Sequence, residues 1–95
     1  MNELELIMNR VVEIRAKLTK YLAIINHPFK NNDFTEEDLE NLKIFRDELP
    51  SLKNKFLLEA NTNDVDENSI IMFLDTIKRL ETQLYEIIEL NNLFV

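Results

Sequence analysis

The sequence contains no glycine, no cysteine and no tryptophan, and proline occurs only twice in its 95 residues. Because only glycine reaches positive φ at little cost, tight hairpins and phosphate-cradling loops are not expected. The lack of cysteine excludes a disulfide scaffold and a thiolate zinc site, which fits a reducing compartment. No long hydrophobic run is present, and the acidic start MNELEL is unlike a basic secretory signal. We therefore expect a cytoplasmic protein with no membrane-spanning segment.

Acidic residues outnumber basic ones by 18 to 11, which gives a formal net charge of −7. The imbalance grows along the chain, since residues 1–26 sum to +1, residues 27–60 to −3 and residues 61–95 to −5. This charge repels phosphate backbones and anionic lipid, so we expect neither a nucleic acid nor a membrane as partner. A net negative charge of this size is typical of a solvated surface. A more specific alternative is that an acidic face imitates nucleic acid and docks on a basic groove.

Apolar residues recur in alternating steps of three and four along three successive segments, a heptad pattern typical of coiled-coil packing. The connecting stretches, HPFKNNDF and NTNDV, are short and polar, so neighbouring helices should run antiparallel. We expect an all-α fold, an antiparallel three-helix up-down-up bundle that forms a single domain over residues 1–95. The expected helices span about residues 3–26, 36–60 and 67–93.

Pro50 falls inside the second expected helix. Proline removes a backbone donor and clashes with the carbonyl four residues earlier, so the helix must kink or end there. The apolar pattern keeps its phase from Phe45 to Phe56, and Leu49 would be a poor N-cap for a new helix. We favour one helix kinked at Pro50, while a break would give a four-helix protein.

A capping signal marks the start of the second helix. In the stretch FTEEDL, the Thr35 side chain can accept from the free amides of the first turn, and Asp38 follows three residues later. The three acids in this turn also suit the positive end of the helix dipole. The sequence therefore predicts a helix that begins directly after Thr35.

Residues 64–75, DVDENSIIMFLD, admit two interpretations. Asp64, Asp66 and Asn68 stand at alternate positions as in a calcium loop, but Ser69 replaces the glycine that such a loop needs for its sharp turn. The stretch is also typical of a helix start with Asp66 as N-cap, because the third apolar stripe begins inside it. A chain cannot wrap an ion and be helical over the same residues, so we expect a helix start and no metal.

Residues suited to catalysis are few. The single histidine, His27, has no second histidine or Glu-x-x-His spacing to form a metal site. The two serines, Ser51 and Ser69, have no recognisable base and orienting acid. We therefore expect no enzyme, no catalytic residue and no cofactor.

The first and third helices carry more apolar residues than one stripe requires. A peripheral helix in a three-helix bundle needs an apolar arc of about 100°, so the surplus indicates a broad core arc, self-association or a surface for another protein. The candidate partner-binding residues are Ile71, Leu74, Tyr85, Ile88, Met8 and Val12.

These features favour a small acidic helical protein that acts by protein–protein binding, as an adaptor or as an inhibitor of a partner protein. The abundance of Asn, Ile and Lys suggests an AT-rich coding genome, such as that of a low-GC bacterium or its phage. One alternative is a self-assembling structural subunit of a larger helical complex, with a homodimer as the simplest case. The other is a toxin-neutralising or immunity protein.

Overall fold

The computed structural model describes residues 2–26, 34–91, 93 and 94, and its regular secondary structure over these residues is entirely α-helical. The helices are α1 (Glu3–Ile25), α2 (Glu36–Thr62) and α3 (Glu67–Leu90), and each packs against both others. The expected all-α bundle of three helices is therefore confirmed, although α3 ends three residues before the expected residue 93.

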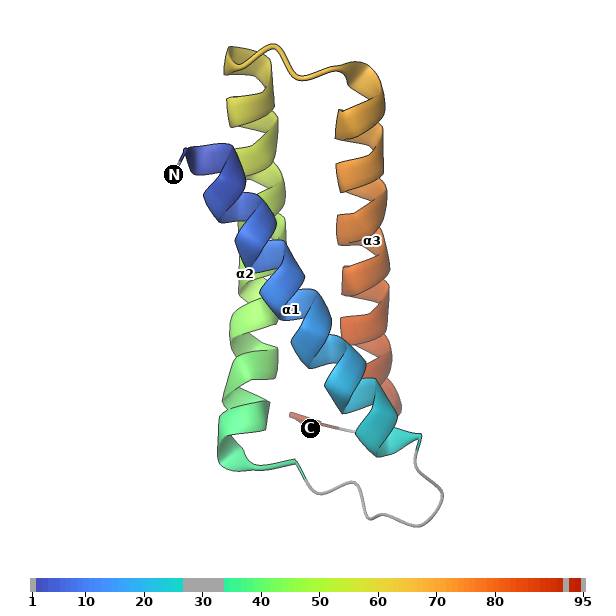
Figure 1. Ribbon diagram of the computed structural model, residues 1–95. Coiled ribbons are helices and arrows are strands. Elements are labelled where there is room, and N and C mark those ends of the chain that lie inside the picture. The colour runs from blue at the N-terminus through green and yellow to red at the C-terminus, as the bar shows by residue number, and fades with distance from the viewer. Residues whose placement is uncertain (1, 27–33, 92, 95) are drawn as a thin grey trace.

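The chain direction alternates from helix to helix, as the colours in Figure 1 show. Helices α2 and α3 lie alongside each other, and α1 crosses them obliquely, beginning beside α2 and ending beside the C-terminal end of α3. The molecule is a rod of 48 × 23 × 22 Å, so its two ends are separate surfaces. None of the helices, across the part of the chain that the structure describes, is long and apolar enough to cross a membrane.

The core is one continuous cluster of apolar side chains from the three heptad stripes. Each buried residue removes apolar surface from water, and this burial is the main favourable term in the stability of such a bundle. Leu4, Ile25, Leu39 and Ile70, which stand at the ends of their stripes, are only partly buried. The buried members are Ile7, Val11, Ile14, Leu18, Tyr21, Leu42, Phe45, Leu49, Leu52, Phe56, Ala60, Phe73, Ile77, Leu80, Leu84, Ile87 and Ile88.

Short polar side chains cap the beginning of each helix. Thr35 and Asp38 form the expected capping box, in which the Asp38 amide donates to the Thr35 hydroxyl and the Thr35 amide donates to the Asp38 carboxylate, both at 3.1 Å. Asp66 accepts from the amide and from the hydroxyl of Ser69, at 3.2 and 2.6 Å. The predicted helix start at Asp66 is thus confirmed, and the stretch compared with a calcium loop is helical from Glu67 onward.

Asparagine stands at the C-cap of all three helices, with negative φ at each position. The C-caps are Asn26, Asn63 and Asn91, and the Glu59 carbonyl accepts from both the backbone amide and the side-chain amide of Asn63, at 2.9 and 2.7 Å. The chain then turns through Asp64, whose φ of 56° lies in the left-handed region that aspartate tolerates better than most residues. The Val65 amide closes this turn by donating to the Ala60 carbonyl at 3.1 Å.

Helix α2 continues through Pro50 without interruption, so residues 36–62 form one helix and not two. The bend that we expected at Pro50 stays a prediction. Pro50 itself is exposed, and the apolar stripe on either side of it remains buried through Leu49 and Leu52. Burial of this stripe compensates for the backbone hydrogen bond that proline cannot make.

Two polar contacts fix the oblique course of α1. Near its N-terminal end, Arg10 donates to both carboxylate oxygens of Glu48 on α2, at 2.6 and 2.7 Å, and its guanidinium lies 5.6 Å from the centre of the Phe45 ring. Hydrogen bonding to Glu48 raises the pKa of Arg10 above its ordinary value. A bidentate pair of this kind fixes orientation as well as distance. The N-terminal half of α1 is therefore held against α2.

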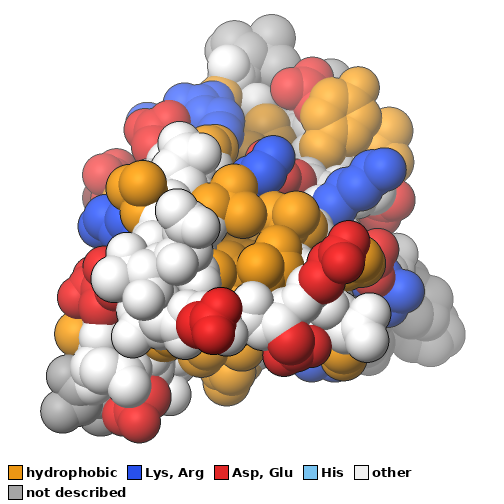
Figure 2. Space-filling view, turned by 90° about the horizontal axis from the view of Figure 1, so that it is seen from above, with side chains coloured by type: hydrophobic (Ala, Val, Ile, Leu, Met, Phe, Trp, Pro, Cys, Tyr) orange, Lys and Arg blue, Asp and Glu red, His pale blue; other side chains and the backbone are white. Residues whose placement is uncertain are grey.

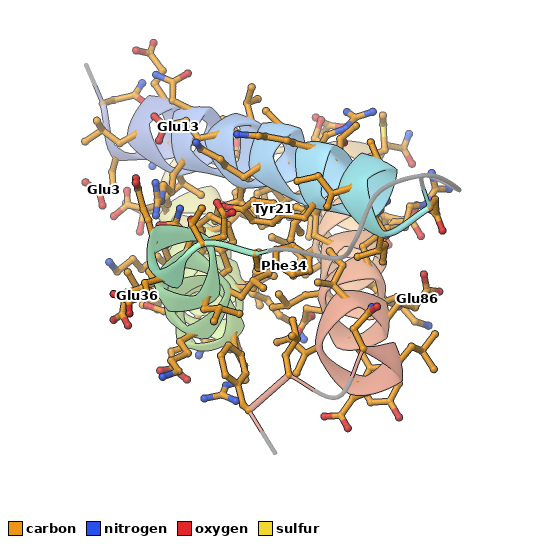
Figure 3. All side chains as sticks on the ribbon, turned by 90° about the horizontal axis from the view of Figure 1, so that it is seen from below. Glu3, Glu13, Tyr21, Phe34, Glu36 and Glu86 are labelled. Carbon is orange, nitrogen blue, oxygen red and sulfur yellow. The ribbon has the colours of Figure 1, made fainter. Side chains whose placement is uncertain are left out.

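Near the other end of α1, Tyr21 is fully buried, and its hydroxyl accepts from the side-chain amide of Asn41 at 3.1 Å. The Phe34 ring packs edge-on against the Tyr21 ring, with centroids 5.7 Å apart. Figure 3 shows these two residues at the centre of the bundle's lower end. Burial raises the pKa of Tyr21, which keeps the hydroxyl neutral and suited to this interior position.

We predict that Pro50→Ala stabilises the protein. Alanine restores the amide that can donate to the carbonyl of Arg46, and it relieves the clash there, so the free energy of unfolding should rise by about 1–3 kcal/mol. Urea unfolding followed by circular dichroism measures this change. The neighbouring Ser51→Ala is the control and should contribute at most about 0.5 kcal/mol. A loss of stability in Pro50→Ala would instead show that packing depends on a bend at Pro50.

We also predict that Asp38 contributes to acid sensitivity. Burial opposes its charge, but hydrogen bonds from the Thr35 amide and hydroxyl outweigh this and lower the pKa of Asp38 below 3.8. Since the folded-state pKa is lowered, the stabilisation is present above the unfolded-state value and is lost as the pH falls through the folded-state value. Asp38→Asn should therefore lower the free energy of unfolding by about 0.3–1 kcal/mol at pH 7. This difference from the wild type should shrink below about pH 4. Thermal unfolding across pH tests this, and a constant difference would contradict it.

Candidate protein-binding surface

Polar side chains suited to catalysis lie apart from one another. Ser51 is exposed on α2, and the Ser69 hydroxyl is engaged by Asp66 at the start of α3. Over residues 2–26, 34–91 and 93–94, no group of three acidic, histidine or cysteine side chains is arranged to hold a metal ion. His27 lies outside the described residues. The described surface instead offers exposed apolar side chains.

Of the six candidate partner-binding residues, four are exposed: Met8, Val12, Ile71 and Tyr85. Leu74 is half-buried. Ile88 is only 6% exposed and belongs to the core, so its selection as a surface residue needs correction. Helix α3 packs against both α1 and α2, which widens its buried arc until it includes both Ile87 and Ile88.

The candidates outside the core do not form one surface, and the exposed Val12 lines neither of the two depressions described below. Ile71, Leu74 and Tyr85 follow one another in combined steps of three and four, which places them on the same helix side. Tyr85 lines a shallow groove of about 150 Å³ between α2 and α3, which we call the α2–α3 groove. Met8 of α1 belongs to a different depression, on the opposite side of α3. The groove is lined by Arg46, Leu49, Glu81, Leu84, Tyr85, Ile88 and Glu89.

The depression that contains Met8 is larger and more apolar, and we call it the α1–α3 hollow. Its volume of about 380 Å³ is similar to that of three other depressions, of about 380–460 Å³, and what distinguishes it is that seven of its nine lining residues are apolar. Stacked rings of Phe56 and Phe73, with centroids 3.7 Å apart and planes at 11°, contribute to it. Figure 2 shows apolar side chains open to solvent at the centre of this end. The lining residues are Leu4, Met8, Val11, Phe56, Val65, Ser69, Met72, Phe73 and Thr76.

The course of α1 explains why this hollow exists. The Arg10–Glu48 pair holds the N-terminal half of α1 on α2, and Figure 1 shows that the first turns of α1 lie farther from α3 than its last turns do. Apolar side chains of α1 and α3 that face this space, above all Met8 and Met72, are therefore not covered by each other. Met8 is 45% exposed and Met72 71% exposed.

The hollow opens at an end of the bundle that is strongly acidic. This acidic end comprises residues 2–9 and 56–77, which contain seven carboxylates and no lysine or arginine. Lys55, Lys78 and Arg79 lie directly beyond these bounds, so seven carboxylates face three basic residues here and this end has a net charge of −4 when the three are counted. The carboxylates belong to Glu3, Glu5, Glu59, Asp64, Asp66, Glu67 and Asp75.

Two of the cations that border the acidic end are in ion pairs. Arg10, the first basic residue after this end on α1, is paired with Glu48 and Glu13. Among the described residues, Asp75 is the one carboxylate of the acidic end in a salt bridge, with Arg79 at 3.1 Å. The acidic end therefore presents a negative potential around an apolar centre.

The α2–α3 groove has a different electrostatic character. Arg46 stands opposite Glu81 and Glu89 in its lining, so both signs of charge are present. Phe94, which follows the end of α3, lies against α2, with the Lys43 ammonium 5.1 Å and the Arg46 guanidinium 5.7 Å from its ring centre. These cation–π contacts attach the end of the described chain to α2.

Neither a family model, nor a curated protein, nor a solved structure matches this chain. The functional argument therefore depends on the geometry of the two surfaces alone.

We predict that charged substitutions separate surface from core on α3. Ile88→Glu buries a carboxylate and should lower the free energy of unfolding by at least about 3 kcal/mol. Ile71 is 55% exposed, so Ile71→Glu should change the free energy of unfolding by no more than about 0.5 kcal/mol. Chemical unfolding followed by circular dichroism compares them. Equal losses in both variants would show that Ile71 is also covered in solution.

Proposed function

We propose that this protein acts by binding another protein through the α1–α3 hollow, as an adaptor or as an inhibitor of its partner. The observation that carries this proposal is an apolar hollow, rimmed by two exposed methionines, on an end of the bundle at which carboxylates outnumber basic residues. Protein interfaces commonly bury a large apolar anchor in such a pocket and surround it with polar groups. A cytoplasmic location, which fits the lack of cysteine, is part of the proposal.

The chemistry of the lining supports a protein ligand. Methionine side chains are flexible and polarisable, so Met8 and Met72 can adapt to the shape of an incoming side chain. The aromatic pair Phe56 and Phe73 gives the hollow a rigid wall, since both rings are almost fully buried. This combination of fixed and adaptable contacts suits an apolar anchor of another polypeptide. Neutralisation of a toxin would be one form of such inhibition.

Self-assembly is the second candidate, and the α2–α3 groove is the surface that favours it. Two copies that met through their acidic ends would bring negative charge against negative charge and repel each other. The α2–α3 groove carries both signs of charge beside Tyr85, which is 63% exposed. A symmetric dimer would therefore form there and leave the α1–α3 hollow open.

Site-specific photo-crosslinking in the cells that express the protein tests the proposed function. Met72 on α3 and Leu58 on α2 are both 71% exposed, but only Met72 lines the hollow. A photoreactive residue at position 72 should give a discrete adduct whose mass differs from that of two copies of the 11.3 kDa chain. The same residue at position 58 is the matched control and should give no such adduct.

Two results would contradict the proposed function. Equal adducts from positions 72 and 58 would mean that contact with other proteins is unselective. An adduct with the mass of two chains would favour self-assembly, and loss of that dimer in Tyr85→Lys would assign it to the α2–α3 groove. Sedimentation of the purified wild type at micromolar concentration adds an independent measure, for which we expect a monomer of 11.3 kDa.

A further inference from the structure

Resting on the proposed function, we infer that the segment bound in the α1–α3 hollow is a basic amphipathic helix. Its apolar face would place large side chains between Met8 and Met72, and its flanking lysine and arginine side chains would face the acidic end. Two kinds of observation on the described residues lead to this partner: the distribution of charge and the shape of the apolar surface.

The negative charge of the acidic end favours a positively charged partner. The acidic end concentrates seven carboxylates on residues 2–9 and 56–77. Each exposed ion pair contributes little by itself, but a potential of one sign over a whole surface speeds encounter with a cationic partner and disfavours an anionic one. A second copy of this chain, a nucleic acid and an anionic lipid surface are all disfavoured by the same field.

The shape of the hollow selects a helix. Helices α1 and α3 flank the hollow and diverge toward the acidic end (Figure 1), so apolar side chains of both helices face an unfilled space. A helix laid in that space would contact Met8 of α1 and Met72 of α3 and would add a fourth member to the bundle. Helical ligands commonly bind grooves in this manner, with anchors spaced by three and four residues.

The arrangement also argues against a metal ion as the ligand of the acidic end. Its carboxylates form no group of three suited to a metal within the described residues. Asp66 is occupied in capping α3 through Ser69, and Asp75 is paired with Arg79. A distributed negative surface around an apolar centre corresponds to an extended cationic partner, because several separate charges can be met at once.

Two designed peptides test this inference. Both are helices of about 18 residues, or five turns, with the same leucine face; one carries lysine and the other glutamate on the polar face. Fluorescence anisotropy with purified full-length protein measures their dissociation constants at low and high salt. We expect the lysine peptide to bind at least about tenfold more tightly than the glutamate peptide at low salt, and this preference to shrink as salt screens the charges.

The contribution of the hollow is measured with uncharged substitutions. Met8→Gln combined with Met72→Gln keeps side-chain length and net charge, and it should weaken the lysine peptide by about fivefold or more, since apolar contacts are lost. The matched control combines Leu6→Gln with Leu58→Gln, whose exposures of 49% and 71% resemble the 45% and 71% of the two methionines. Neither leucine lines the hollow, so the control should bind like the wild type.

The contribution of charge is measured with two triple variants. Glu3→Gln, Glu5→Gln and Glu67→Gln neutralise first-turn glutamates of α1 and α3 at the acidic end, and they should weaken the lysine peptide by about fivefold at low salt. The control neutralises Glu36, Glu37 and Glu86, two of which lie in the first turn of α2. These residues belong to the beginning of α2 and to the last turns of α3, which lie at the lower end of the bundle in Figure 1, opposite the acidic end; Figure 3 views the bundle from that lower end. This control should retain most of the affinity.

The outcomes separate this inference from the proposed function. If both peptides bind equally and both are lost in the methionine variant, the hollow binds protein but charge does not choose the partner, so the inference is overturned alone. If the lysine peptide binds the methionine variant and the wild type equally, attraction is unselective and the inference is overturned. Failure of both peptides to bind also overturns it, while the crosslinking at position 72 still decides the proposed function.

Discussion

Burial of one apolar stripe from each of three helices against the other two is the constraint on which this structure depends. The chain has no glycine, disulfide or described metal site to assist, so the shared core must supply most of the favourable free energy. Each stripe is continuous enough to override an unfavourable residue, as α2 shows by remaining helical through Pro50. Ile88 belongs to the core for the same reason, because α3 buries apolar side chains against both α1 and α2.

The core alone does not set the angle at which α1 lies. The Arg10–Glu48 pair and the buried contact between Tyr21 and Asn41 fix α1 to α2 at two separated points. Because the first point lies toward the N-terminal end, α1 leaves α3 uncovered there, and the α1–α3 hollow results. The hollow therefore lies beside the part of α1 that the Arg10–Glu48 pair holds against α2.

The function that we propose depends on a surface where the bundle leaves its own apolar side chains uncovered. Met8 and Met72 could have been covered by a closer approach of α1 to α3, but they stay exposed at the acidic end. Exposed apolar surface and uncompensated charge each oppose stability or solubility in different ways. Both features lie on one end of the bundle. A cationic partner with an apolar face would cover the apolar surface and compensate the negative charge.

The sequence by itself determined the all-α class, the three helices, the capping residues Thr35 and Asp66, and almost the whole core, because these follow from periodicity and local hydrogen bonding. Only the tertiary structure decided which surplus apolar residues remain outside. It moved Ile88 into the core, placed Met8 and Tyr85 on different sides of α3, and brought residues 2–9 together with residues 56–77. Charge summed along the chain could not reveal that end, since its two segments are far apart in sequence. The angle between helices is set by pairs such as Arg10 and Glu48, and no helical period encodes which distant carboxylate an arginine will meet.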